Sequence, residues 1–255
     1  MLPVLAGALL CAAACGSTDP GTGTDGGGST DLASGGSTDL AGADLTGSGT
    51  RFSFFVTSLK ALQALSGSAS GFGGDLSYGQ TGAGAGLRGA DKICATIAER
   101  SLKGAGQKPW RAFLSATADE NGKQVDAIDR VGNGPWYDRL GRLLAMTKAD
   151  LLFDRPRGAD PAIINDFPNE DGVPNHQPDP NMPQADNHDF LTGTNKQGKL
   201  YAANATCLDW TGNKGDKNGP EGRPRCGHSW PRQGSGVNWM DSLTESGCAP
   251  GVNLI

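Results

Sequence analysis

The sequence predicts one loop-rich globular domain that mixes short strands with a helix and follows an exported N-terminal segment. Three observations lead to this interpretation. An uncharged apolar N-terminus ends at a cysteine, a long stretch of Gly, Ser, Thr and Asp follows it, and residues 51 to 255 contain four further cysteines and all five tryptophans. The length of that last part fits a single domain.

Residues 1 to 14 are interpreted as a lipoprotein signal peptide. They are apolar or small, and three alanines precede Cys15, as cleavage by a signal peptidase requires. We therefore expect Cys15 to be the lipidated residue, in preference to Cys11, which lies inside the apolar run. A transmembrane helix is disfavoured because a span needs about 20 apolar residues. The usual basic residues are missing from this signal, which leaves an upstream start codon as an alternative.

Residues 16 to 50 predict a disordered tether, because they carry too little apolar surface to offset the entropy of ordering. A flexible coil of this length reaches roughly 30 to 35 Å. The tether contains five of the 27 acidic residues and no basic one, so the remaining 22 acids balance the 22 Lys and Arg of the domain. A neutral domain without a basic cluster argues against a nucleic-acid partner.

Cys15 and the tether together predict attachment to a lipid bilayer in the cell envelope. Gly16 follows the acceptor in place of Asp, which by resemblance to known sorting signals favours the outer membrane. The domain would then face outward or into the periplasm.

Four cysteines follow Cys15 in the chain: Cys94, Cys207, Cys226 and Cys248. Oxidation is the default for an exported protein, so we expect two disulfides among these candidates. The sequence leaves all three pairings open. A cysteine zinc site is disfavoured because no CxxC or HExxH spacing occurs.

The pattern of apolar residues predicts a strand over 51 to 58, with Phe52, Phe54 and Val56 on one face. Four segments follow in order: an extended Gly-rich loop over 59 to 86, an amphipathic helix from Leu87 to Gly104 with Cys94 on its buried side, a strand over 110 to 115, and a core segment over 142 to 146. The Pro-, Asn- and Asp-rich segment from 154 to 192 is the expected ligand-facing loop.

Several short motifs occur in a recognisable order: FVTS at 55 to 58, GADKIC at 89 to 94, WRAFLS at 110 to 115, GPWYD at 134 to 138, TGT at 192 to 194, CLDWT at 207 to 211 and GHS at 227 to 229. With these motifs the chain resembles the endostatin domain of collagen XVIII. It is still more similar to a family of bacterial surface lipoproteins of unassigned function that share that fold. The resemblance covers nearly all of 51 to 255 and implies a C-type-lectin-like α+β fold, with a helix pair against a small antiparallel sheet and long loops.

The resemblance also implies a disulfide pattern. It pairs Cys207 with Cys248, and it pairs the helix cysteine with a cysteine in a closing Tyr-Cys-Phe strand that the sequence does not reach before Ile255. We therefore expect a C-terminally incomplete domain with its final strand missing. Cys226 would be an extra cysteine that pairs locally or with Cys94.

No catalytic motif stands out. A GxSxG motif is absent, and Ser229 beside His228 is interpreted as part of a turn. The leading interpretation is accordingly a non-catalytic binding domain for carbohydrate or an extracellular matrix protein, and not an enzyme. The alternatives are an envelope hydrolase that uses carboxylates of the 166 to 189 loop, such as Asp166 and Glu170, and a structural surface protein without a ligand.

Calcium is the one cofactor for which the sequence offers candidate ligands. Gln177-Pro-Asp179 and Trp239-Met-Asp241 are similar to tripeptides with which C-type lectins bind calcium and sugar, and Asp171 offers a further oxygen ligand. A solvated loop rich in Pro and Asp remains the preferred interpretation. The resemblance agrees, since endostatin-like domains fold without calcium.

Overall fold

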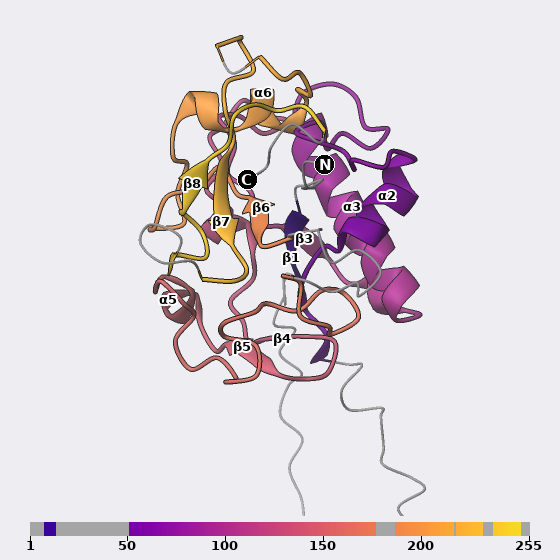
Figure 1. Ribbon diagram of the computed structural model, residues 1–255, viewed down its shortest axis with the longest axis vertical. Helices are drawn as coiled ribbons and strands as arrows, with labels where there is room; N and C mark the ends of the chain where they lie inside the picture. Colours follow the sequence, from indigo (N-terminus) through magenta and orange to yellow (C-terminus); the bar gives the residue numbers. More distant parts are fainter. Residues whose placement is uncertain (1–7, 14–50, 177–186, 217, 232–236, 251–255) are drawn as a thin grey trace, which may run out of the picture.

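The computed structural model describes residues 8–13, 51–176, 187–216, 218–231 and 237–250 (Figure 1). It combines short helices with small sheets, as the predicted α+β class requires. The main sheet has the strand order β2-β1-β6-β7-β8, and β3 also pairs with β1. Its strands are β1 (Ala8–Ala13), β2 (Phe54–Val56), β3 (Trp110–Ala112), β6 (Asp189–Leu191), β7 (Arg225–His228) and β8 (Leu243–Thr244). A second sheet pairs β4 (Trp136–Tyr137) with β5 (Leu143–Ala145).

Most helices are a single turn. The described helices are α2 (Leu59–Ser66), α3 (Ala85–Ser101), α4 (Ala127–Arg130), α5 (Lys148–Leu151) and α6 (Cys207–Trp210), with 3-10 turns η1 (Ala105–Gln107) and η2 (Ala203–Ala205). In Figure 1, α2 and α3 lie on the right, β7 and β8 lie on the left, and β1 and β3 lie between them.

The predicted helix after Leu87 is confirmed as α3. Its apolar residues at helical spacing are buried, among them Ile93, Cys94 and Ile97, so the periodicity of the sequence reports the face that packs on the sheet. The helix ends before Gly104, which has a left-handed backbone with φ of 87°. Side chains with a Cβ disfavour that conformation, and glycine does not.

The loop predicted for residues 59 to 86 is wrong over its first eight residues, which form α2. Ser58 caps this helix by accepting a hydrogen bond from the Ala61 amide, and Gly67 ends it with a left-handed backbone. Leu59 and Leu62 are buried on one face. The capping signals were present in the sequence, but the many glycines that follow obscured them.

The strand predicted at 51 to 58 is confirmed as the shorter β2. The prediction that Phe52, Phe54 and Val56 share one face is wrong. Phe54 and Val56 pack in one apolar cluster, whereas Phe52 and Phe55 pack in the other. Ser53 lies outside the regular strand, so the alternation does not extend to Phe52. Because β2 contributes to both clusters, its side chains are buried on both faces.

Strand β1 lies inside the main sheet. It pairs antiparallel with β2 and β3 and parallel with β6, and Cys11 at its centre is buried and bonded to Cys94 of α3. The predicted domain begins at residue 51, so this earlier segment adds a strand that the prediction did not include. Cleavage in front of Cys15 would remove β1 from the mature chain.

The structure contains two disulfides, Cys11–Cys94 and Cys207–Cys248. The second has the pairing that the resemblance implied. The expectation that Cys226 forms a disulfide is wrong, because its thiol is free. Cys226 lies on β7 between Leu191 and Leu243 of the neighbouring strands. Burial in this apolar core raises the pKa of the thiol well above its usual value, so the thiol stays protonated and unreactive.

Removing the Cys207–Cys248 disulfide should destabilise the domain strongly. The bond closes a separation of 41 residues, and the loss of this constraint on the unfolded chain predicts a decrease of about 4 kcal/mol in the free energy of unfolding. Urea denaturation of Cys207→Ala/Cys248→Ala measures this decrease. The control Cys226→Ala removes a buried thiol without a disulfide and should cost only about 1 kcal/mol. An equal effect of both changes would contradict the prediction.

Candidate functional site

The register between β6 and β7 brings a histidine opposite an aspartate. Asp189 pairs with His228 across the two antiparallel strands, and residues directly opposite on neighbouring strands project to the same face of a sheet. The His228 Nε2 lies 2.6 Å from the Asp189 Oδ1. Both side chains are only 3% exposed, so this ion-pair contact lies in the interior.

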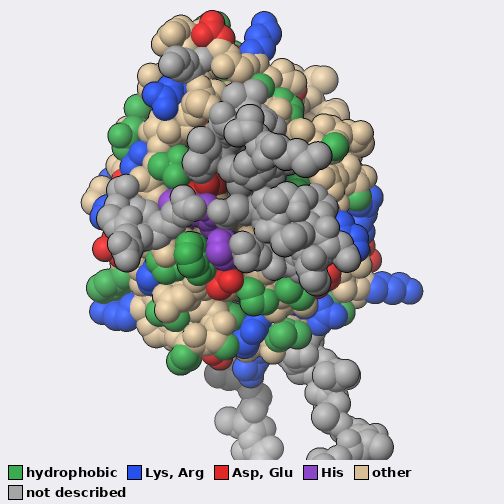
Figure 2. All heavy atoms as spheres, viewed as in Figure 1, with side chains coloured by type: hydrophobic (Ala, Val, Ile, Leu, Met, Phe, Trp, Pro, Cys, Tyr) green, Lys and Arg blue, Asp and Glu red, His purple; other side chains and the backbone are tan. Residues whose placement is uncertain are grey.

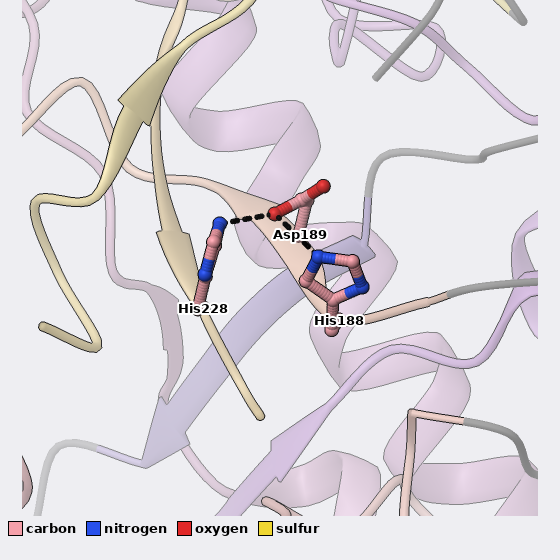
Figure 3. A group of neighbouring side chains, drawn as sticks. All are labelled: His188, Asp189 and His228. Carbon is pink, nitrogen blue, oxygen red and sulfur yellow. Dashed lines mark ion pairs between the residues drawn. The ribbon is translucent and has the colours of Figure 1, made fainter. Parts of the chain in front are cut away.

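A second histidine approaches the same carboxylate oxygen. His188 immediately precedes β6, and its Nε2 lies 3.5 Å from the Asp189 Oδ1. The His188 and His228 rings are nearly perpendicular, with centroids 4.9 Å apart. Figure 3 shows both imidazoles directed at the Asp189 carboxylate from either side. Two ring nitrogens and one carboxylate oxygen therefore converge within 4.8 Å of one another.

The backbone around both histidines is held by hydrogen bonds. The Ser229 amide donates to the His188 carbonyl at 2.7 Å, and the Arg155 guanidinium donates to the His228 carbonyl at 2.8 Å and the Ser229 carbonyl at 2.5 Å. Burial lowers the pKa of Arg155 to about 10, so it remains charged at neutral pH. These contacts fix the positions from which the two rings project.

The close packing of β7 also explains why glycine precedes His228. A Cβ on Gly227 would lie 1.8 Å from the Trp239 carbonyl oxygen, a distance that no side chain can occupy. Glycine therefore lets the Trp239 backbone pack directly on β7 beside the site.

The third histidine of the chain flanks this cluster. His176 has its ring centroid 5.7 Å from that of His188 and stacks on Trp230, with centroids 4.1 Å apart and an interplanar angle of 1°. Asp166 accepts hydrogen bonds from the amides of Asn175 and His176. All three histidines of the sequence thus gather at one place, and histidine side chains are visible on the face shown in Figure 2.

This arrangement has the donor set for a metal ion but lacks an aligned seryl nucleophile. The Ser229 hydroxyl donates to the His188 carbonyl oxygen at 3.3 Å, and not to an imidazole, so a serine-histidine pair is not formed there. Within the described ranges, His188, Asp189 and His228 are the one group of three or more residues of metal-ligating type that converge.

The calcium candidates do not gather into such a cluster. Asp179 lies outside the described residues. Asp171 is exposed in a turn, and Asp241 pairs with the Arg225 guanidinium, whose Nε lies 2.5 Å from its Oδ1. Neither belongs to a converging group of three ligands in the part of the chain that the structure covers.

The carboxylates considered for a hydrolase make structural contacts. Glu170 is buried and accepts hydrogen bonds from the amide and hydroxyl of Ser58, the residue that caps α2. Asp166 orients the backbone at His176, as described above. Cys15, the predicted lipidation site, lies outside the described residues.

From the sequence, His228 was considered only together with Ser229, and His176 and His188 were given no role. His188 and His228 stand far apart in the chain, and neither occurs in a metal-binding motif. Their proximity depends on the β6–β7 register, which cannot be predicted from strands as short as these. The available signal was the gathering of His176 and His188 in the loop already expected to face a ligand.

No family model, curated protein or solved structure matches this chain. None of the helices in the described ranges is long and apolar enough to cross a membrane.

The buried Glu170 makes stability depend on pH in a predictable direction. Burial raises the pKa of Glu170 from 4.5, and hydrogen bonds from Ser58 oppose this shift only in part. Between the unfolded and the raised folded pKa, the folded state binds more protons, so the free energy of unfolding falls as the pH rises. Glu170→Gln should lose this contribution. Urea denaturation from pH 4 to 8 should therefore show wild type losing stability relative to the variant, and a constant difference would contradict the assignment.

Proposed function

We propose that this chain is an exported, lipid-anchored binding domain of C-type-lectin-like fold that acts without catalysis. The observation that carries the proposal is the disulfide between Cys207 and Cys248. Both cysteines are buried, and the bond joins α6 to the last described segment of the domain. Such a bond persists in oxidising compartments, which supports export. The anchor rests on Cys15 and its preceding apolar run.

The contacts of the acidic and histidine side chains support binding over hydrolysis. Glu170 and Asp166 bond to backbone amides, Asp189 faces two imidazoles, and Ser229 donates to a carbonyl. A hydrolase needs an acid and a base or nucleophile set around a substrate bond. These groups are instead used to hold the loops that would contact a ligand.

The anchored form differs from the structure at one strand. Cleavage before Cys15 removes β1 and with it Cys11, the disulfide partner of Cys94. Processing would lipidate Cys15 and leave thiols at Cys94 and Cys226. In the unprocessed chain Cys94 is bonded to Cys11, and the cysteines outside the two disulfides are Cys15 and Cys226.

Cys15→Ser should abolish lipidation. Expressed in a bacterial host that processes lipoproteins and fed labelled palmitate, the wild-type chain should take up label and partition into the detergent phase. The matched change Cys11→Ser should leave labelling intact, because Cys11 lies in the part that is cleaved away. Labelling of the Cys15→Ser chain would contradict the anchor.

Mapping the free thiols of the same material tests the fate of β1. Maleimide labelling of the denatured, unreduced protein, followed by peptide mapping, should modify Cys94 and Cys226 after processing. An unmodified Cys94, with residues 1 to 14 still present by mass, would rule out the proposed cleavage.

The ligand class can be tested on the purified chain. We expect a carbohydrate or an extracellular matrix protein to bind the face formed by the loops around His176 and Trp230. A glycan and matrix-protein array probed with and without calcium should yield a ligand whose binding falls on Trp230→Ala, with the exposed Leu152→Ala as control. An empty array would count against the binding role, and an equal loss in both variants would count against this face.

A further inference from the structure

We propose that His188, Asp189 and His228 form a binding site for a divalent transition-metal ion of the zinc type. The site goes beyond the binding role proposed above and does not depend on the lipid anchor. It is built from β6, β7 and the residue that precedes β6, all of which the structure describes.

The distances between the three potential ligand atoms suit one shared ion. Ligand atoms at 2.0 to 2.2 Å from a tetrahedral zinc ion are about 3.3 to 3.6 Å from one another. The Asp189 Oδ1 lies 2.6 Å from the His228 Nε2 and 3.5 Å from the His188 Nε2. The two imidazole nitrogens lie within 4.8 Å of each other. An ion between the three atoms requires the 2.6 Å contact to lengthen by less than about 1 Å and the nitrogen–nitrogen distance to come to about 3.3 to 3.6 Å.

The orientation of the rings agrees with shared ligation. Two imidazoles that bind one ion at the tetrahedral angle have centroids about 5 Å apart. The His188 and His228 centroids are 4.9 Å apart, and both rings direct a nitrogen at the same carboxylate (Figure 3). The separation of the centroids therefore needs no rearrangement of the strands.

The identity of the donors selects the class of metal. Imidazole nitrogens favour zinc and similar transition metals, whereas calcium and magnesium require mostly oxygen ligands. Two nitrogens and one carboxylate oxygen match the sets found in zinc sites that keep a fourth position open. The His176 ring, with its centroid 5.7 Å from that of His188, flanks the cluster but is not part of the converging set.

Burial of the carboxylate provides an independent argument. Asp189 is 2% exposed, and its Oδ2 accepts no hydrogen bond from the described residues. A buried carboxylate is costly unless charge or hydrogen bonds compensate it. A divalent cation held by the Asp189 Oδ1 and the two imidazoles would compensate this buried charge.

The backbone around the ligands is already fixed for such a site. The Arg155 guanidinium donates hydrogen bonds to the carbonyls of His228 and Ser229, and the Ser229 amide donates one to the carbonyl of His188. A preorganised set of ligands loses little conformational entropy on binding an ion. A site of this kind forms without large movement of the chain.

The test is zinc titration of the purified full chain, oxidised, stripped of metal and free of any polyhistidine tag. Competition against a fluorescent zinc indicator should give one zinc ion per chain. Zinc should also raise the melting temperature, because it binds the folded state, and calcium and magnesium at the same concentration should not. Cobalt in place of zinc should give the visible absorption bands of a four-coordinate site.

Single changes then locate the site. His188→Gln and His228→Gln keep an amide donor for Asp189 but remove the metal ligand, and each should weaken zinc binding about tenfold or more. The matched control is His176→Gln, the same change on the same face but outside the converging set, and it should stay within about threefold of wild type. Circular dichroism and retained disulfides establish that each variant is folded.

Each outcome decides the proposal. A wild-type chain that binds no stoichiometric zinc and shows no zinc-dependent melting shift overturns it, and this result requires no variant to fold. Zinc binding that survives both His188→Gln and His228→Gln, or that is lost only with His176→Gln, also overturns it. Loss of lipidation or an empty ligand array leaves these measurements unchanged, so the two proposals fail separately.

Discussion

The pairing of β6 with β7 is the constraint on which the rest of the structure depends. Its register sets Asp189 opposite His228 and places Cys226 between the leucines of its neighbours. Side chains alternate along a strand, so a slip of β6 by one residue would send Asp189 to the opposite face of the sheet from His228 and break their contact. Arg155 and the backbone of Trp239 pack around these strands and oppose such a slip.

Periodic segments of the fold could be predicted from the sequence, and segments defined by long-range pairing could not. Helix α3 and strand β2 were found because their apolar residues repeat at helical or strand spacing. Helix α2 was missed because glycine-rich sequence surrounds its short apolar face. The site was missed because His188 and His228 are brought together by the pairing of β6 with β7. The spacing of the two histidines in the sequence gives no sign of that pairing.

Strand β1 illustrates how one apolar segment can satisfy two physical demands. A run of Ala and Leu without charge suits insertion into a membrane during export, and it suits a strand that lies between neighbours inside a sheet. In the structure, this segment pairs with three strands and bonds Cys94 through Cys11. Composition alone could not separate these roles, since both require apolar, uncharged residues.

The buried Cys226 has a consequence for how the chain folds. In an oxidising compartment every thiol of the unfolded chain is accessible, so Cys226 competes with the cysteines that are bonded in the folded domain. Only completion of the β6–β7–β8 sheet removes it from this competition, because burial there holds the thiol protonated. Formation of the two disulfides therefore competes with exchange through Cys226 until these strands have paired.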